Sequence, residues 1–210
     1  MIKTENLLFS YEDDSRKSFS FPDINLEINE NLVILGRSGI GKTTFMHLLA
    51  GLLKPIQGSI HINNTDINNL SKSKLTTFRG EHIGLVFQKK YAIRSLNVIE
   101  NLRVRLLFCK QKVDNDLIEE LLEDLGLSPH KKSKIQTLSE GELQRLGIAM
   151  AIVHRPKIIL ADEPTSSLDD ENANIVMELM LRQAEKTNAN LLVITHDQRV
   201  KAFFNKTIAL

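Results

Sequence analysis

Cysteine and tryptophan are almost missing from this sequence, which has one cysteine, Cys109, and no tryptophan. A single cysteine cannot form a disulfide within the chain, nor can it build a cysteine-rich zinc site. We therefore expect Cys109 to be a free thiol, buried like a small apolar residue. The chain has 210 residues, of which 42% are hydrophobic, so it can bury a stable core without crosslinks. This length favours one domain, or one domain with an inserted subdomain.

The sequence also lacks an excess of charge of either sign and any long apolar run. Lys and Arg number 27, and Asp and Glu number 26, whereas a dedicated nucleic-acid-binding domain usually carries a basic excess. No stretch reaches the roughly 18 consecutive apolar residues typical of a membrane-spanning helix. Residues 1–6 lack the apolar stretch of a signal peptide. We expect no nucleic-acid partner, a cytoplasmic location, and any membrane role to come through a partner protein.

Short apolar runs indicate a parallel sheet in an α/β fold. Residues 31–35, 157–161 and 191–195 each read as a buried strand followed by a turn. After the first run, apolar residues recur at helical spacing and predict an amphipathic helix that contains Phe45, Leu48, Leu49, Leu52 and Leu53. Between Gln88 and Arg155 helical patterns dominate. The first thirty residues and residues 59–62 predict an added antiparallel strand layer.

A glycine-rich segment follows the first predicted strand and matches the P-loop pattern G-x-x-x-x-G-K-[ST]. Glycines let a loop curl so that its N–H groups point at phosphate oxygens, and the next helix directs its positive end toward the same anion. In this pattern Lys42 reaches the β- and γ-phosphates and the Thr43 hydroxyl binds Mg²⁺. The residues that we expect to bind ATP here are Gly36, Arg37, Ser38, Gly39, Ile40, Gly41, Lys42, Thr43 and Thr44.

Two acidic residues, Asp162 and Glu163, end the second apolar run, and Pro164 stops the strand. Asp162 is placed to hold Mg²⁺, generally through water, and Glu163 to polarise an attacking water as a general base. Together with the P-loop, this pair predicts a nucleotide hydrolase or kinase.

A third segment, Leu138-Ser139-Glu140-Gly141-Glu142-Leu143-Gln144-Arg145, resembles the signature of the ATP-binding cassette (ABC) family. Ser139 is a good helix N-cap, and Glu142 completes a capping-box pattern three residues later. The helix N-terminus then presents N–H groups to an anion. The resemblance implies that Ser139, Gly141 and Glu142 contact ATP bound to the other subunit of a dimer.

The resemblance covers nearly the whole chain and implies further roles. Gln88 matches the glutamine that contacts Mg²⁺ and the attacking water, and His196 matches the switch histidine that contacts the γ-phosphate. Residues 166–169 look like the D-loop that crosses the dimer interface, so Asp169 is a further contact to the other subunit's ATP. Tyr11 stands where cassettes carry an aromatic residue that stacks on adenine, and Phe9 is the competing candidate.

The signature departs from the family pattern, which usually has two adjacent glycines followed by glutamine. Here Glu140 replaces a glycine and Glu142 replaces the glutamine. Carboxylates suit a free helix N-terminus but not the approach of a triphosphate. Related cassettes carry a glutamate at the Glu142 position. Our hypothesis is that Glu140 weakens the ATP-bound dimer.

These patterns predict one ABC ATPase domain over residues 1–210: a nucleotide-binding core, 1–88 and 152–210, and a helical subdomain, 89–151. The resemblance implies an ATP-sandwich homodimer that uses ATP and Mg²⁺ and drives a separate integral-membrane permease from the inner face of the cell membrane. We expect Arg79 and the segment after Gln88 either to contribute to permease docking or to be ordinary surface.

The resemblance is greatest to the lipoprotein-release, macrolide-export and cell-division cassettes, which favours export, extraction or mechanical transmission. A cell-division cassette that regulates cell-wall hydrolysis without moving a substrate is the alternative. A soluble cassette acting on ribosomes or DNA is disfavoured, because the chain carries one uninterrupted cassette.

Overall fold

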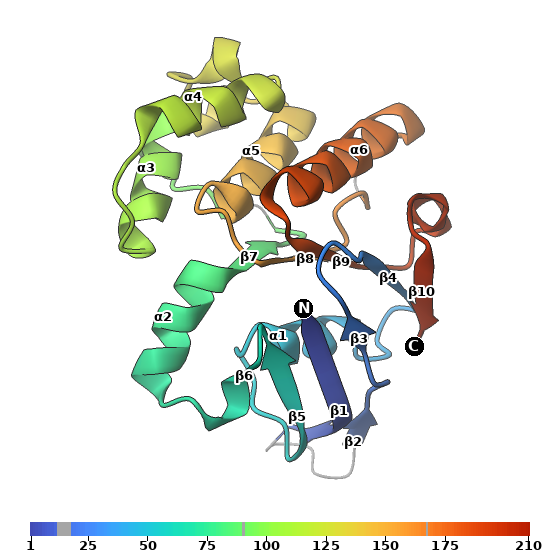
Figure 1. Cartoon of the computed structure of the whole chain (residues 1–210). Coiled ribbons are helices and arrows are strands. Elements are labelled where there is room, and N and C mark those ends of the chain that lie inside the picture. Colours follow the sequence, from blue (N-terminus) through green and yellow to red (C-terminus); the bar gives the residue numbers. More distant parts are fainter. Residues whose placement is uncertain (12–17, 90, 167) are drawn as a thin grey trace.

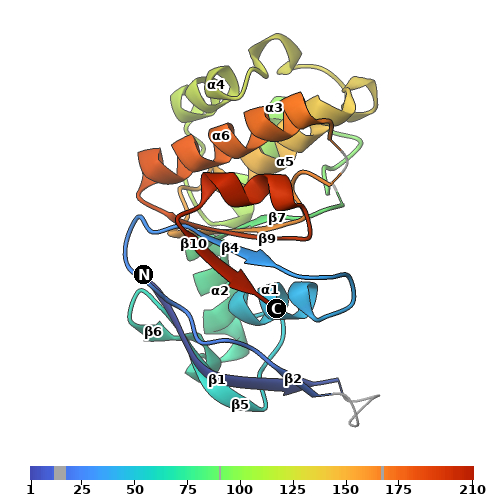
Figure 2. The same ribbon diagram turned by 90° about the vertical axis from the view of Figure 1, so that its right-hand side faces the viewer.

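The computed structural model describes residues 1–11, 18–89, 91–166 and 168–210. Within these described residues, two sheets and six α-helices lie in layers, with the parallel sheet in the middle (Figures 1 and 2). This arrangement confirms the predicted α/β class.

The parallel sheet has the strand order β10-β4-β9-β8-β7. Its strands in chain order are β4 (Leu32–Leu35), β7 (Ile83–Val86), β8 (Ile158–Asp162), β9 (Asn190–Thr195) and β10 (Lys206–Ala209). The three predicted strands are confirmed as β4, β8 and β9, whose residues are all buried. The sequence patterns did not predict β7, which contains Gly84, or β10, a mostly exposed edge strand.

The antiparallel layer is also confirmed, with the order β2-β1-β5-β6 and β3 paired to β1. Its strands are β1 (Ile2–Ser10), β2 (Ser18–Ser20), β3 (Asn25–Leu26), β5 (Gln57–Ile62) and β6 (Thr65–Asp66). The turn between β5 and β6 uses Asn63 and Asn64, both with left-handed backbone angles, as asparagine tolerates.

The helices are α1 (Lys42–Leu49), α2 (Lys72–His82), α3 (Val98–Phe108), α4 (Asn115–Asp124), α5 (Glu140–Ile152) and α6 (Asp170–Thr187). Short 3₁₀ turns are η2 (Ile67–Asn69), η3 (Ser128–His130), η4 (Ile135–Thr137) and η5 (Gln198–Phe203). The prediction that Leu52 and Leu53 belong to the first helix was wrong. That helix ends at Leu49 because Gly51 adopts a left-handed backbone (φ 62°), a common way to terminate a helix.

Alternate residues of the parallel strands enter two separate cores. Leu32 and Ile34 pack with α1 and the antiparallel sheet on one face, whereas Val33 and Leu35 pack with α3–α6 on the other. Between Gln88 and Arg155 the described residues form helices and turns, and none of them belongs to a named strand. The last of these helices, α5, packs on β7 and α6 and so joins the helical region to the sheet.

Cys109 is a free thiol and 4% exposed, as predicted, and burial raises its pKa. Within the described residues, no helix is both long enough and apolar enough to span a membrane.

Candidate functional site

The phosphate loop connects β4 to α1 and turns tightly because two of its glycines have left-handed backbone angles. Gly39 has φ 81° and Gly41 has φ 108°, values that other residues rarely adopt. A Cβ atom on Gly41 would also lie 2.7 Å from Cδ1 of Phe19. Both the backbone and the available space therefore require glycine at position 41.

An open pocket of about 330 Å³ lies beside this loop. The predicted site residues that line it are Ser38, Gly39, Gly41, Lys42, Thr43 and Thr44 from the loop and α1, Gln88 after β7, Glu163 after β8, and His196 after β9. Phe19 of β2 completes the lining, whereas Gly36, Arg37 and Ile40 lie in the loop outside it. These segments meet because parallel strands bring their carboxyl ends to one edge of the sheet.

The Lys42 ammonium is held inside the loop. Its Nζ donates hydrogen bonds to the carbonyl oxygens of Gly36 (2.8 Å) and Arg37 (3.1 Å). The Glu163 Oε1 atom lies 3.5 Å from the same nitrogen. Lys42 is only 6% exposed, and a buried charge needs such partners. The contacts place one positive charge at the floor of the pocket.

Thr43, which lines the pocket, is hydrogen-bonded to the buried Asp162 behind it. The Thr43 hydroxyl donates to Asp162 Oδ2 at 2.9 Å. The other oxygen, Asp162 Oδ1, is buried and has no hydrogen-bond partner among the described residues. Burial raises the pKa of Asp162, the Thr43 hydrogen bond partly opposes this, and the nearby Glu163 adds to it. Hard cations such as Mg²⁺ prefer oxygen ligands, so an unsatisfied carboxylate oxygen beside a hydroxyl fits that ion.

The buried Asp162 carboxylate predicts a stability effect. Its pKa in the folded protein is raised, so the ionised form destabilises the fold at pH 7; below about pH 4 the carboxyl is protonated in folded and unfolded chains alike. We expect Asp162→Asn, without metal or nucleotide, to unfold about 2–4 °C higher at pH 7, equivalent to roughly 1 kcal/mol. The gain shrinks towards pH 4. Melting curves from pH 4 to 8 in chelator test this, and a lower melting temperature at pH 7 contradicts it.

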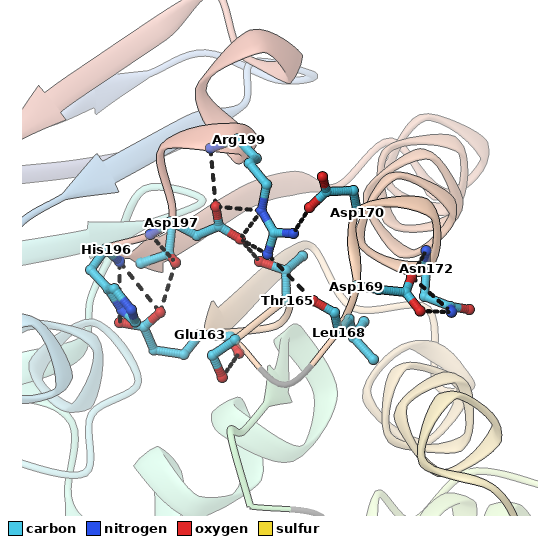
Figure 3. Close-up of polar contacts among 11 residues, drawn as sticks. Glu163, Thr165, Leu168, Asp169, Asp170, Asn172, His196, Asp197 and Arg199 are labelled. Carbon is cyan, nitrogen blue, oxygen red and sulfur yellow. Dashed lines mark hydrogen bonds and ion pairs between the residues drawn. The ribbon is translucent and has the colours of Figure 1, made fainter.

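Glu163 is fixed by residues at the end of β9 (Figure 3). Thr195 Oγ1 donates to Glu163 Oε2 at 2.7 Å. His196 Nδ1 lies 2.8 Å from Glu163 Oε1, and Figure 3 shows this pair. Glu163 also has a left-handed backbone (φ 49°), and such strain in a non-glycine residue is often found at functional sites. Burial alone raises the Glu163 pKa, but the hydrogen bonds from His196 and Thr195 outweigh it and hold the pKa below its ordinary value.

Tyr11, the residue that follows strand β1, contacts the start of helix α1. Its hydroxyl is 2.8 Å from Thr44 Oγ1, its ring meets the edges of Phe9 and Phe19, and the residue is 43% exposed. The competing candidate, Phe9, is 6% exposed and belongs to the core. Of the two candidate residues, Tyr11 is the one with an accessible ring.

The signature segment forms the predicted helix N-terminus. Ser139 caps α5: the Glu142 backbone N–H donates to Ser139 Oγ (3.4 Å), and Glu142 Oε2 accepts from the Ser139 backbone N–H (2.7 Å). This capping box confirms the sequence pattern. The hydrogen bond from the Ser139 backbone lowers the pKa of Glu142, and His130 Nε2 lies 3.0 Å from Glu142 Oε1.

Asp169 caps the N-terminus of α6. Its Oδ1 accepts a 2.8 Å hydrogen bond from the backbone N–H of Asn172, and Figure 3 shows the pair. This hydrogen bond lowers the Asp169 pKa. The neighbouring Ser167, part of the predicted D-loop, lies outside the described residues.

Comparisons with known proteins identify the family of this chain. The family model described as "ABC transporter" matches residues 21–166. The chain belongs to the ABC transporter family. It is 34% identical to "Lipoprotein-releasing system ATP-binding protein LolD" of Legionella pneumophila (strain Lens), covering 100% of this chain and 94% of the relative. It is 35% identical to the protein of that name from Syntrophus aciditrophicus (strain SB), covering 100% and 96%.

A solved cassette has the same fold. It is the "Dimeric structure of a post-hydrolysis state of the ATP-binding cassette MJ0796 bound to ADP and Pi", with a TM-score of 0.88, 31% identity, and coverage of 100% of this chain and 94% of that chain. The present chain is thus an ATP-binding, ATP-hydrolysing cassette of the ABC type.

The predicted site residues of this cassette fall into two groups. One group surrounds the phosphate loop, as described above. The other consists of Ser139, Gly141, Glu142 and Asp169, which all lie in the described part of the chain and do not line the pocket. Both signature and D-loop residues therefore lie away from the Lys42 pocket of their own chain.

Sequence reasoning missed two residues that contribute to the site, of which one, Phe19, lines the pocket and the other, Thr195, is buried behind it. Thr195 orients Glu163 through its hydroxyl, and Phe19 lines the phosphate pocket. A hydroxyl residue at the end of a buried strand, directly before His196, is a signal for Thr195. The position of Phe19 depends on strand pairing across the antiparallel sheet, and no local pattern shows it.

Proposed function

We propose that this cassette is the ATPase subunit of a membrane transport complex of the lipoprotein-release type. Two copies bind two ATP molecules between them and drive a separate permease, by extraction or mechanical transmission. The observation that carries the proposal is the convergence of Lys42, Gln88, Asp162, Glu163 and His196 around one phosphate loop. The names of the similar proteins, lipoprotein-releasing system ATP-binding proteins, support the lipoprotein-release assignment.

ATP binding rests on the phosphate loop and Lys42. The Lys42 ammonium already lies at the pocket floor among carbonyl oxygens, and a phosphate oxygen is a stronger partner because it carries charge. Tyr11 offers an exposed ring at the pocket's side for the adenine base. Thr43, Gln88 and Asp162 would hold Mg²⁺. When bound, that ion neutralises charge developing on the phosphate oxygens.

Hydrolysis rests on Glu163. Its pKa is lowered, so the carboxylate is ionised at neutral pH and can accept a hydrogen bond from an attacking water. Thr195 and His196 fix both of its oxygens and so set its direction. His196 is 56% exposed at its side chain and lines the same pocket, within reach of a γ-phosphate there.

A second copy of the chain supplies the remaining contacts. Ser139, Gly141 and Glu142 form an exposed or half-buried helix start, and Asp169 starts α6. None of the four reaches its own chain's pocket. A dimer that places them over the partner's phosphate loop gives them a role, and the similar cassette bound to ADP and phosphate is dimeric.

Permease docking is proposed at an apolar groove beside the segment that follows β7. Its apolar lining includes Leu85, Phe87, Tyr91, Met150 and Ala151, with Gln144 among the polar residues. Tyr91 is 65% exposed and its ring packs edge-on against Phe87. Gln88 lines the phosphate pocket, and its sequence neighbours Phe87 and Lys89 line the groove, so motion at either can reach the other. Arg79 lies outside the groove and donates to the Gly51 carbonyl (3.0 Å).

Co-purification tests this function. Tagged Glu163→Gln is expressed in cells and extracted in mild detergent with ATP, and the bound proteins are identified. We expect an integral-membrane protein with a large outer domain, and Lys42→Ala, which should bind ATP poorly, is the matched control that recovers less of it. Recovery of ribosomal components, or of no membrane protein despite ATP-induced dimerisation, overturns the transport proposal and leaves the ATPase assignment intact.

Glu140 offers a separate prediction. It is the first residue of α5, at the start of the signature helix, where its charge opposes an incoming triphosphate. We expect Glu140→Gly and Glu140→Gln to strengthen ATP-dependent dimerisation about two- to fivefold, the scale of one exposed charge contact. The glutamine variant keeps helix propensity, so it separates charge from backbone effects. The hypothesis is wrong if ATPase rate and ATP affinity stay unchanged in both variants.

A further inference from the structure

Arg199 joins two segments that are far apart in the sequence, as Figure 3 shows. Its Nε and Nη2 atoms donate to the Asp197 carboxylate (2.9 and 2.7 Å) in the loop after β9. Its Nη1 atom donates to Asp170 Oδ1 in the first turn of α6, and its Nη2 approaches the Leu168 carbonyl oxygen at 3.5 Å. One guanidinium thus connects the His196 loop to the start of α6.

On one side this contact reaches the hydrolytic pair. Asp197 directly follows His196, and its Oδ2 accepts a 2.8 Å hydrogen bond from the fully buried Thr165, two residues after Glu163. The Asp197 backbone N–H donates to Thr195 Oγ1 (3.0 Å), the hydroxyl that donates to Glu163. The hydrogen bond from Arg199 lowers the pKa of Asp197 to about 2, so this carboxylate is ionised at neutral pH.

On the other side the contact flanks Asp169. Leu168 and Asp170, both held by Arg199, are its immediate neighbours. In the contacts described, Asp169 bonds forward into α6: its carboxylate accepts from Asn172 and its carbonyl oxygen accepts from the Ala173 N–H. The backbone position of Asp169 is therefore set from both sides, by the helix that it caps and by Arg199.

We propose that Arg199 is a positioning residue for ATP hydrolysis: it holds segments 195–197 and 168–170 in fixed register, so that Glu163 and Asp169 are oriented together. This role rests on the proposed ATP-sandwich dimer, in which Glu163 acts on the chain's own nucleotide and Asp169 on the partner's. Arg199 touches no substrate. Arginine suits the task because its planar fork reaches two carboxylates and a carbonyl at once, which a lysine ammonium does not.

The exposed fractions of the side chains indicate how much each Arg199 contact contributes to folding stability. The side chain of Arg199 is 39% exposed and that of Asp170 is 85% exposed. An ion pair as exposed as that with Asp170 contributes little to folding stability. The Asp197 side chain is only 10% exposed, so removing Arg199 also costs some stability, because that carboxylate loses its guanidinium partner. Asp197 keeps its hydrogen bond from Thr165, and we expect the variant to fold with a lower melting temperature while the register between the two segments is released.

The test compares steady-state ATPase kinetics of the full chain with Arg199→Ala, Arg199→Lys and Asp170→Asn. We expect Arg199→Ala to lower kcat at least fivefold, with KM for ATP within twofold and the protein still folded at the assay temperature, as melting curves check. Arg199→Lys should recover part of the loss. Asp170→Asn should lower kcat less, and the double variant Arg199→Ala/Asp170→Asn should be no slower than Arg199→Ala alone. The matched control is Glu171→Gln, which removes one negative charge from the first turn of α6, as Asp170→Asn does. We expect its kcat to stay within twofold of the parent value.

Hydrogen exchange provides a readout that does not depend on turnover. Without nucleotide, Arg199→Ala should speed amide exchange in residues 168–172, and Glu171→Gln should not. Three results would each overturn the positioning role. They are an unchanged kcat in Arg199→Ala, a loss of kcat in Glu171→Gln as large as that in Arg199→Ala, and an unchanged rate of amide exchange at residues 168–172 in Arg199→Ala. An inactive parent protein with the expected exchange difference instead contradicts the hydrolytic roles proposed for Glu163 and Asp169, and it leaves the contact between the two segments standing.

Discussion

Glu163→Gln is expected to lower kcat for ATP hydrolysis by about 10²–10⁴-fold, the usual contribution of a positioned general base. The substitution keeps the shape of the side chain and an oxygen that can accept from Thr195. It removes the negative charge that orients water. It also removes the carboxylate 3.5 Å from Lys42 Nζ, which leaves that ammonium freer to bind phosphate. ATP affinity should therefore be preserved or increased.

Two measurements decide this prediction: phosphate release under saturating ATP, and gel filtration with and without ATP. The variant should form an ATP-dependent dimer that persists because hydrolysis is slow. Thr195→Val is an informative companion. It removes the hydroxyl that orients Glu163 but keeps the carboxylate, so its kcat should fall less. A Glu163→Gln rate above one tenth of the parent rate contradicts the role of Glu163 as base.

Lys42→Ala is expected to weaken ATP binding about 10- to 100-fold, because a hydrogen bond to a charged group contributes roughly 1.5–3 kcal/mol. The substitution removes the positive charge at the pocket floor, and it leaves the Gly36 and Arg37 carbonyls without their donor. Glu163 also loses its lysine neighbour. We expect both affinity and kcat to fall.

Calorimetric titration with a slowly hydrolysed ATP analogue measures this effect. The control is Lys206→Ala. Lys206 lies on the edge strand β10, outside the pocket lining, and forms an ion pair with Glu30 at the surface. It should bind the analogue like the parent. A dissociation constant for Lys42→Ala within threefold of the parent value contradicts the assignment of Lys42 to the phosphates.

The phosphate loop shows why some local structure could be predicted from the sequence. The strand, the glycines with positive φ, and the helix start that form it are consecutive in sequence, so neighbouring residues determine its shape. The capping box at Ser139 and Glu142 spans three residues and was equally readable. The strands β4, β8 and β9 were readable because burial on both faces makes them continuously apolar.

Elements with weaker local signals were missed or misjudged. The edge strand β10 is largely exposed and carries no apolar run. The helical spacing of Leu52 and Leu53 continued past the end of α1, because apolar periodicity does not show that Gly51 adopts a left-handed backbone.

The sequence by itself determined the ABC family, the nucleotide chemistry and most of the residues that line the pocket beside the phosphate loop, because each of these depends on short segments with a defined backbone shape. Only the tertiary structure decided how Thr195 and His196 fix Glu163, and how Arg199 connects Asp197 to Asp170. The physical reason is that these contacts join the ends of different strands and helices. Their distances follow from the order in which β8 and β9 pair in the sheet and from the packing of α6 upon it, and no local pattern of residues specifies that order.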